Sequence, residues 1–249
     1  MHLSVAILAL AVVASGAACG GSNQPARPAA APTDTADGPG VITGTTLFEG
    51  TPPPPRPLRT DSDPLCKPEP GAVAEILLVG PGNGLQNVFV YVKDGLGART
   101  YAPPATPAAL DQKGCRYIPH VFGLQVGQTL RITNSDTALH NVNATAAVNS
   151  GFNFGQPTGV PAATKVFDKP EVMVPIRCDV HNWMNAHAGV LPHPFFAVST
   201  ADGRFEIKGL PAGTFTIEAW HEQLGRQTQT VTVEAAKPAT ASFAFKMQT

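Results

Sequence analysis

Four residues of the types that bind copper stand close together in the second half of the chain. Cys178, His181 and Met184 follow one another at three-residue intervals in Cys-Asp-Val-His-Asn-Trp-Met, and His140 lies upstream. Two imidazoles and one thiolate form a covalent trigonal plane around copper, with a thioether as the weak axial ligand. One short loop would bring three ligands to the metal, and the first histidine would come from elsewhere. These residues predict a mononuclear type 1 (blue) copper site that transfers single electrons.

The stretch before Cys178 reads as the strand that positions this loop. Apolar residues alternate from Val172 through Val174 and Ile176 to Cys178. A strand has a side-chain period of two, so the thiol should share the core face with the aliphatic residues. Burial and metal binding would protect the thiolate from oxidation.

The remaining histidines are weighed against this ligand set. His187 follows Met184 and is an alternative fourth ligand, although Met184 is the expected one. His120, His193 and His221 are isolated, and isolated histidines are more often hydrogen-bonded structural residues.

Composition frames the fold and excludes some functions. The chain has 249 residues, 43% of them hydrophobic and 14% charged, which allows one large or two small cores. With 24 Gly and 25 Pro, long helices are disfavoured. The 17 basic and 18 acidic residues leave a net charge of -1, which gives no general electrostatic reason to bind nucleic acid. The partner is expected to be a small molecule or a protein.

The first 18 residues are expected to be an export signal. Their apolar stretch, Val5 to Val13, is too short to span a bilayer and is followed by small residues. Ser15-Gly16-Ala17-Ala18-Cys19 resembles a bacterial lipoprotein cleavage box, which predicts lipidation of Cys19; the alternative is an ordinary signal peptide cut nearby. Residues 19–39, rich in Pro, Ala and Gly, are expected to be a disordered tether. The predicted location is the periplasm or cell envelope, with contact to the membrane only through a lipid anchor.

Two cysteines then remain unassigned. If Cys19 carries lipid and Cys178 carries metal, Cys66 and Cys115 are left, and in an oxidising compartment a disulfide between them is expected. The alternative is two buried free thiols.

Short strands bounded by Gly, Pro, Asn or Asp are expected throughout the chain after the tether, and no helix of ordinary length is expected. The expected strands are Val41 to Phe48, Ala74 to Val79, Val88 to Val92, Thr129 to Thr133, Val172 to Arg177, Arg204 to Ile207, Thr214 to Ala219 and Thr228 to Val233. The fold class is therefore all-β.

A resemblance to cupredoxins extends over about residues 105–192. Residues 117–136 (YIPHVFGLQVGQTLRITNSD) look like the family's aromatic-x-Pro start, glycine turn and strand ending in Asn-x-Asp. The short Cys-x2-His-x2-Met loop is most similar to that of amicyanin, and His140-Asn141-Val142 resembles the first-ligand motif of amicyanin and plastocyanin. The resemblance implies a Greek-key β-sandwich.

The same resemblance implies roles for the site residues. His140, Cys178 and His181 would be equatorial ligands and Met184 the axial ligand of one copper ion. Asn141 would tie the His140 loop to the Cys178 loop. In such sites the loop imidazole usually reaches the surface, so His181 is the expected electron port, flanked by Trp183, Asn182 and Met173.

The C-terminal part resembles the carboxypeptidase regulatory-like, transthyretin-like β-sandwich. The similarity lies in residues 201–220, and residues 40–50 and 86–92 look like the opening strands of the same module. We therefore expect a discontinuous domain, 40–104 plus 193–249, into which the copper domain 105–192 is inserted. Two consecutive domains are the alternative.

The function predicted from these patterns is that of an electron carrier and not of an enzyme. A complete four-ligand set leaves no open coordination position, a binuclear copper centre would need a second loop cysteine, and a thioether is a poor zinc ligand. The expected partner is a redox protein such as a c-type cytochrome or a quinoprotein. Copper storage or delivery by a lipoprotein without an electron-transfer role is the alternative function.

Overall fold

The computed structural model describes residues 40–247. The predicted export signal, the lipidation of Cys19 and the tether lie outside the described residues. The strands are β1 (Gly40–Phe48), β2 (Phe89–Asp94), β3 (Ala108–Gln112), β4 (Tyr117–Ile118), β5 (Val121–Gln125), β6 (Thr129–Asn134), β7 (His140–Ala144), β8 (Phe152–Gln156), β9 (Ala163–Val166), β10 (Glu171–Arg177), β11 (Asn185–Leu191), β12 (Phe196–Val198), β13 (Arg204–Leu210), β14 (Gly213–His221), β15 (Gly225–Val233) and β16 (Pro238–Phe245). Within residues 40–247 the helical structure is a single 3-10 turn, η1 (Pro81–Asn83), and none of it is long and apolar enough to cross a membrane. The protein is all-β, as predicted.

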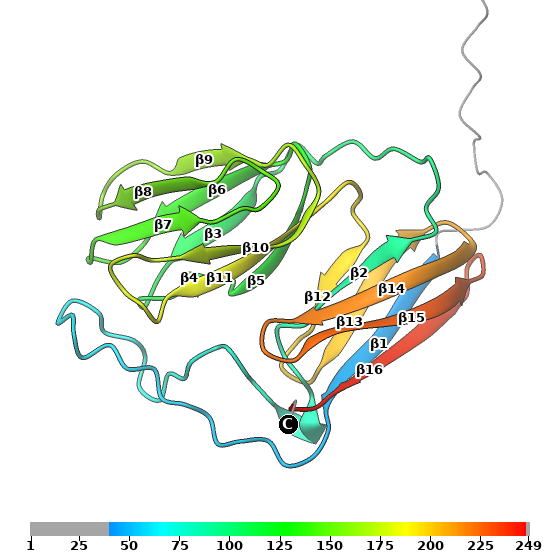
Figure 1. The fold of residues 1–249 in the computed structure, drawn as a ribbon, viewed down its shortest axis with the longest axis horizontal. Helices are drawn as coiled ribbons and strands as arrows, with labels where there is room; N and C mark the ends of the chain where they lie inside the picture. Colours follow the sequence, from blue (N-terminus) through cyan, green and yellow to red (C-terminus); the bar gives the residue numbers. More distant parts are fainter. Residues whose placement is uncertain (1–39, 248–249) are drawn as a thin grey trace, which may run out of the picture. The chain divides into compact units, whose positions relative to one another are not determined.

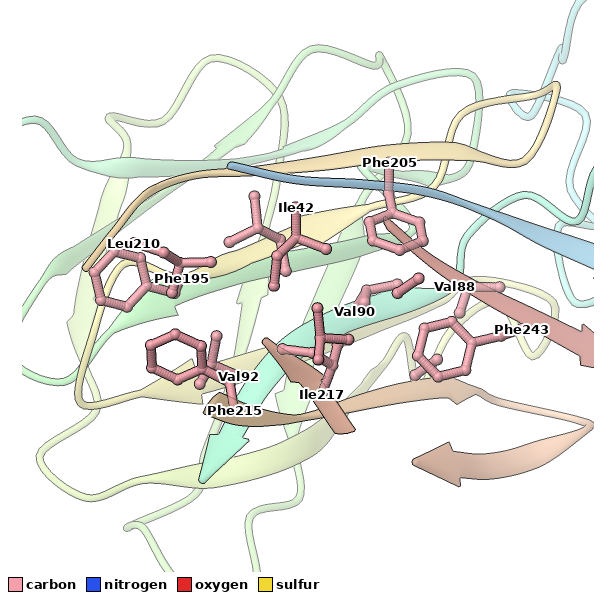
Figure 2. Packing of buried hydrophobic residues seen from close by; sticks show 14 of the residues in the cluster. Ile42, Val88, Val90, Val92, Phe195, Phe205, Leu210, Phe215, Ile217 and Phe243 are labelled. Atoms are coloured by element: carbon pink, nitrogen blue, oxygen red, sulfur yellow. The ribbon is translucent and has the colours of Figure 1, made fainter. Parts of the chain in front are cut away.

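One sandwich is built from the first two strands and the last five. Its sheets have the orders β13-β1-β16 and β12-β2-β14-β15. Alternating residues of these strands face inward, as in β16, where Ala241, Phe243 and Phe245 are buried and their neighbours are not. Figure 2 shows the resulting core, in which aromatic and β-branched side chains from both sheets meet. Period-two patterning of this kind stabilises a sheet that buries one face.

The second sandwich is built from the strands between these two groups. Its sheets have the orders β5-β11-β10-β7-β8 and β4-β3-β6-β9. A separate core fills it, and that core includes Cys178 and Met184. The chain therefore leaves the first sandwich after β2, completes β3 to β11, and returns at β12, which pairs with β2 (Figure 1). We call β3–β11 the central sandwich and the other the outer sandwich.

Two glycines allow rings of the outer sandwich to lie against the central one. Gly123 of β5 and Gly189 of β11 are paired across the sheet. A Cβ at Gly123 would come within 2.3 Å of Phe196, and one at Gly189 within 2.3 Å of Phe89. The two rings stack with centroids 5.6 Å apart. Any larger residue at these two positions would displace the stacked rings.

The expected strand at Ala74 to Val79 is wrong. This stretch belongs to a long connection, residues 49–80, which we call the strap and which makes isolated bridges such as Pro57 to Val73. Its apolar residues Leu77 and Val79 pack against the outer core without joining a sheet. An apolar run bounded by turns satisfied the strand pattern, but its backbone has no continuous strand partner.

Candidate metal centre

Strand pairing brings the histidine and cysteine of the predicted site together. His140 is the first residue of β7, and Cys178 directly follows β10. These two strands are antiparallel neighbours, with Arg177 opposite Asn143. Val174, Ile176 and Cys178 are buried in alternation, as the period of two predicts. The thiol therefore faces the inside of the central sandwich beside the start of β7.

The loop after Cys178 turns back on itself and adds His181. The backbone N–H of Cys178 donates to the carbonyl oxygen of Met184 (3.1 Å), and the N–H of Met184 donates to that of His181 (3.0 Å). Met184 is buried in the same core as Cys178. This short closed loop holds the thiol, the imidazole and the thioether residue within one turn of chain.

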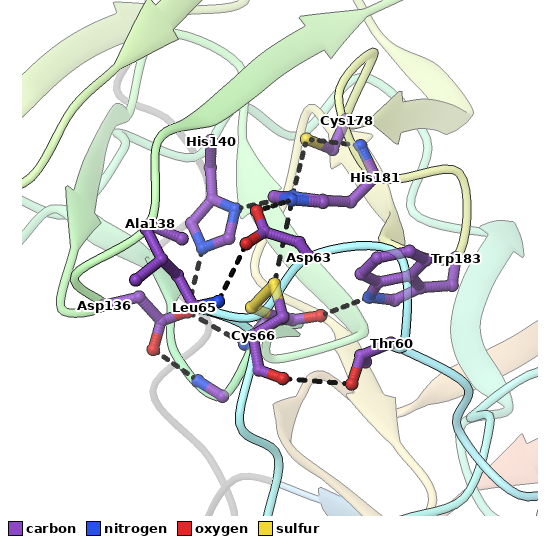
Figure 3. Close-up of a disulfide and its surroundings, with 12 residues drawn as sticks. Thr60, Asp63, Leu65, Cys66, Asp136, Ala138, His140, Cys178, His181 and Trp183 are labelled. Atoms are coloured by element: carbon purple, nitrogen blue, oxygen red, sulfur yellow. Dashed lines mark hydrogen bonds and ion pairs between the residues drawn. A yellow bond between two sulfur atoms is a disulfide. The ribbon is translucent and has the colours of Figure 1, made fainter.

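Three donor atoms face one another at the distances a shared metal requires (Figure 3). The Nδ1 atoms of His140 and His181 lie 3.0 Å apart, and Cys178 Sγ lies 3.7 Å from His181 Nδ1. All three residues are buried, and their ligand atoms lie within 4.8 Å of one another. With metal–donor bonds of about 2.0–2.3 Å, donors around one ion lie roughly 3–4 Å apart. The arrangement fits a copper ion held by two imidazoles and a thiolate.

The outer nitrogen of each imidazole is bound to a carboxylate. His140 Nε2 lies 2.8 Å from Asp136 Oδ2, and His181 Nε2 lies 2.9 Å from Asp63 Oδ2. A carboxylate fixes the proton on Nε2 and leaves the Nδ1 lone pair free to bind a metal. Two lone pairs that face each other at 3.0 Å would repel, so either a proton or a metal ion must lie between them. The arrangement therefore holds a proton between His140 and His181 in the metal-free protein and offers both Nδ1 atoms to a metal ion that replaces it.

The surroundings favour a thiolate at Cys178. Burial opposes the charge, but hydrogen bonds from His140 and from the backbone N–H groups of Asn141 and His181 outweigh it and lower the pKa of the thiol. Burial also opposes a proton on His140, yet Asp136 and then Cys178 raise the pKa of that imidazole to about 9. In the metal-free protein a protonated His140 thus favours the thiolate form of Cys178, and a metal ion would take over that role.

Asn141 connects the two ligand-bearing segments. Its backbone N–H lies 3.3 Å from Cys178 Sγ, and its side-chain Oδ1 accepts a hydrogen bond from the N–H of Asp179 (3.2 Å). The N–H of His181 also points at the sulfur, at 3.4 Å. These contacts fix the thiolate relative to β7.

The expected role of His181 as an exposed electron port is wrong. Its side chain is only 2% exposed. Asp63 and Cys66 of the strap cover its Nε2 edge, and the ring of Trp183 lies 4.9 Å from it on another side. Met173, expected to flank the port, packs instead in a separate apolar cluster with Phe89. The resemblance that implied an exposed imidazole covers about residues 105–192, and the strap, residues 49–80, lies outside that range.

A disulfide links the strap to the central sandwich. Cys66 and Cys115 are joined, with Cα atoms 5.5 Å apart, and Cys66 Sγ lies 3.7 Å from His181 Nε2. Each disulfide sulfur also belongs to a cluster of potential metal ligands, with Asp63 and His181 or with Asp136 and His140. Because both sulfurs are oxidised and both clusters share the imidazoles above, neither is an independent site.

The alternative ligand His187 lies in a second histidine cluster. Its Nε2 lies 3.3 Å from Glu222 Oε2, and His120 Nε2 binds the other oxygen of the same carboxylate. Hydrogen bonds from His120 and His187 lower the pKa of Glu222 to about 2, although its burial acts in the opposite direction. We call these three residues the Glu222 cluster. It is a hydrogen-bonded network between the residue that precedes β5, a residue of β11 and the turn after β14.

The other two isolated histidines are structural. His193 Nδ1 accepts a hydrogen bond from the N–H of Phe195, and His221 Nδ1 accepts from those of Gln223 and Leu224. Burial lowers the pKa of both rings, that of His221 to about 4. Both rings are therefore neutral hydrogen-bond acceptors.

Comparisons with known proteins find similarity among solved structures alone. No family model matches the chain, and no curated protein matches it. Among solved structures, a copper-containing nitrite reductase from Thermus scotoductus SA-01 is similar at 21% identity, over 40% of this chain and 25% of that one, with a TM-score of 0.33. A purple cupredoxin from Nitrosopumilus maritimus is similar at 22% identity, over 33% of this chain and 98% of that one, with a TM-score of 0.29. An oxidised amicyanin mutant is similar at 17% identity, over 41% of this chain and 97% of that one, with a TM-score of 0.31. The chain thus spans about a quarter of the length of the nitrite reductase.

Sequence reasoning missed the two carboxylates of the centre. Asp136 lies within the Asn-x-Asp stretch that carried the resemblance, four residues before His140, and that spacing was an available signal. Asp63 lies 118 residues before His181. Its only local signal is its position three residues before Cys66.

Proposed function

We propose that this chain is a type 1 copper protein that carries single electrons at the bacterial cell envelope. The observation that supports this most is the convergence of His140 Nδ1, His181 Nδ1 and Cys178 Sγ, with both Nε2 atoms bound to carboxylates. On this proposal Met184, which is buried beside Cys178, is the axial ligand.

The residues of the chain would hold the site in one geometry. Bound copper would supply one-electron chemistry by cycling between Cu(I) and Cu(II). Asp136 and Asp63 orient the two imidazoles, and Asn141 holds the sulfur through its N–H. Burial excludes water from the thiolate and from both rings. A site that barely rearranges suits rapid electron exchange.

Burial also separates this function from copper delivery. A protein that hands copper to a partner needs at least one ligand that the partner can reach. Here His140, Cys178 and His181 are all buried, and the strap covering His181 is tied down by a disulfide. Carriage of electrons requires only that a partner come near, so it agrees better with this arrangement.

The partner is proposed to be a redox protein such as a c-type cytochrome or a quinoprotein. Three apolar side chains that are about half exposed directly precede residues of the centre: Leu65 before Cys66, Leu139 before His140 and Val180 before His181. Exposed apolar groups near a redox centre suit a small, short-lived interface. These residues replace the exposed imidazole as the proposed approach for electrons.

The domain assignment is likewise a proposal. We propose that residues 40–104 and 193–249 form a carboxypeptidase regulatory-like sandwich and that the cupredoxin domain 105–192 is inserted into it, because β2 pairs with β12 and β14 across the insertion. Lipidation at Cys19 would anchor the protein in the envelope.

A redox titration in the presence of a Cu(I) chelator tests the proposed function. Residues 40–249 are loaded with Cu(II), reduced, and reoxidised with a c-type cytochrome, while the visible spectrum is recorded. Electron carriage predicts that the colour bleaches and returns with one electron per chain and that the chelator removes no copper. Loss of the copper to the chelator on reduction would instead support storage or delivery.

A further inference from the structure

The strap places a negative charge against the imidazole of His181. Asp63 Oδ2 lies 2.9 Å from His181 Nε2. A carboxylate only accepts hydrogen bonds, so the proton of this contact lies on Nε2. His181 Nδ1 points the other way, toward His140 and Cys178 (Figure 3).

The local chain fixes the direction of this carboxylate. Its second oxygen, Oδ1, accepts the backbone N–H of Leu65 at 2.8 Å. The N–H of Cys66 donates to the carbonyl oxygen of Asp63 (3.0 Å), and the hydroxyl of Thr60 donates to that of Cys66 (3.0 Å). The turn from Thr60 to Cys66 is thus closed on itself before it meets the imidazole, so Asp63 is preorganised.

The disulfide joins this turn to the carboxylate of the other imidazole. Cys66 is bonded to Cys115, whose N–H donates to Asp136 Oδ2 (2.8 Å), and the same oxygen binds His140 Nε2. The disulfide therefore connects the turn that carries Asp63 to the residue that holds Asp136, so the carboxylates of both imidazoles are linked.

We propose that Asp63 is a positioning residue that lowers the reduction potential of the bound copper by holding His181 through a charged hydrogen bond. This proposal rests on the proposed function. A carboxylate bonded to Nε2 makes Nδ1 a stronger donor, and the more highly charged Cu(II) gains more from that than Cu(I) does. The disulfide keeps the charge in place by tethering the turn.

The decisive substitution is Asp63→Asn, which keeps the shape and removes the charge. Loss of a residue that is hydrogen-bonded to a metal ligand typically weakens metal binding about 10- to 100-fold. If that loss falls on Cu(II), the reduction potential rises by about 59–118 mV, at 59 mV per tenfold change for one electron. Protein-film voltammetry of the copper-loaded chain measures the potential directly.

A matched control lies two residues away. Asp61 is exposed on the same turn, so Asp61→Asn makes the same change of charge where water and salt screen it. The control is expected to leave the potential unchanged within the error of measurement. Asp63→Glu, which keeps the charge, should restore most of the wild-type potential.

A metal-free readout makes the proposal independent of copper loading. Imidazole NMR spectra of the apoprotein should show a His181 Nε2 proton that exchanges slowly in wild type and rapidly in Asp63→Asn. If Asp63→Asn keeps both the wild-type potential and the protected proton, the inference is wrong. If the wild-type protein shows no thiolate-to-copper absorption band after Cu(II) loading, the proposed function fails. If the wild type shows that band while Asp63→Asn keeps the wild-type potential and the protected proton, the role of Asp63 alone is overturned.

Discussion

Two clusters each combine a pair of histidines from the central sandwich with one or two carboxylates, yet their atoms are arranged in opposite ways. In the metal centre the carboxylates lie outside the pair, one on each Nε2, so the Nδ1 atoms of His140 and His181 face each other beside a thiol. In the Glu222 cluster one carboxylate lies between the rings and binds both Nε2 atoms.

The position of the carboxylate decides what each cluster can bind. A carboxylate between two imidazoles forms a hydrogen bond with each and occupies the place that a cation would take. Carboxylates on the outer edges instead orient the rings and leave their inner lone pairs free. Residue types alone do not separate the two clusters, because His187 also stands near the ligand loop in sequence.

The largest expected effect on copper binding comes from removing one imidazole of the metal centre. His140→Ala should remove the blue spectrum and weaken Cu(II) binding by more than the ~10- to 100-fold that loss of an outer partner costs. His187→Ala is the matched substitution in the Glu222 cluster and should leave Cu(II) affinity and spectrum unchanged. Competition titrations against a chelator measure both affinities. An equal loss in the two variants would mean that His187 is a ligand and that the comparison is wrong.

The next largest effect is expected from loss of the Cys66–Cys115 disulfide, which lies beside the metal centre and has no equivalent in the Glu222 cluster. Replacing both Cys66 and Cys115 by Ser should lower the free energy of unfolding by about 4 kcal/mol, because the bridge closes a loop with a sequence separation of 49. Denaturant unfolding of the metal-free chain measures this. Cys178→Ser, which leaves the bridge intact, serves as the control for changing a buried cysteine. A double variant as stable as wild type would contradict the structural role given to the strap.

A smaller effect is expected from the central carboxylate of the second cluster. Glu222→Gln should destabilise the protein by about 2–3 kcal/mol near neutral pH, since it weakens hydrogen bonds from two histidines to a buried charge. The copper spectrum should not change. Thermal melts and absorption spectra recorded side by side check both parts.

The same variant should alter the acid dependence of stability. The pKa of Glu222 is lowered from 4.5 to about 2, so its stabilising contribution is complete above about pH 4.5 and is lost as the pH falls toward 2. In Glu222→Gln the free energy of unfolding should therefore fall less steeply over this range. A wild-type slope in the variant would show that Glu222 is not held as an ion pair.

Much of the ligand loop was predictable because its information is local. The spacing of Cys178, His181 and Met184 and the period-two strand before them place the thiol in the core, and the structure buries it there. Most of the expected strands were also found, because turn residues and alternating patterns mark them.

What escaped prediction depends on contacts between distant residues. Asp63 meets His181 across 118 positions, and Glu222 meets His120 across 102. A lone acidic residue in a polar turn looks like any solvated side chain until the fold places it against an imidazole. The resemblance to cupredoxins implied an exposed His181, and nothing local in the sequence indicates that the strap covers it.

The central claim is that one copper ion is held by the Nδ1 atoms of His140 and His181 and by the thiolate of Cys178. The most direct measurement is the visible absorption and electron paramagnetic resonance spectrum of Cu(II)-loaded residues 40–249, beside Cys178→Ser and Met184→Leu. The account predicts an intense thiolate-to-copper band that bleaches reversibly, vanishes in Cys178→Ser and is altered but retained in Met184→Leu. A pale spectrum of ordinary tetragonal copper, unchanged in Cys178→Ser, would contradict it.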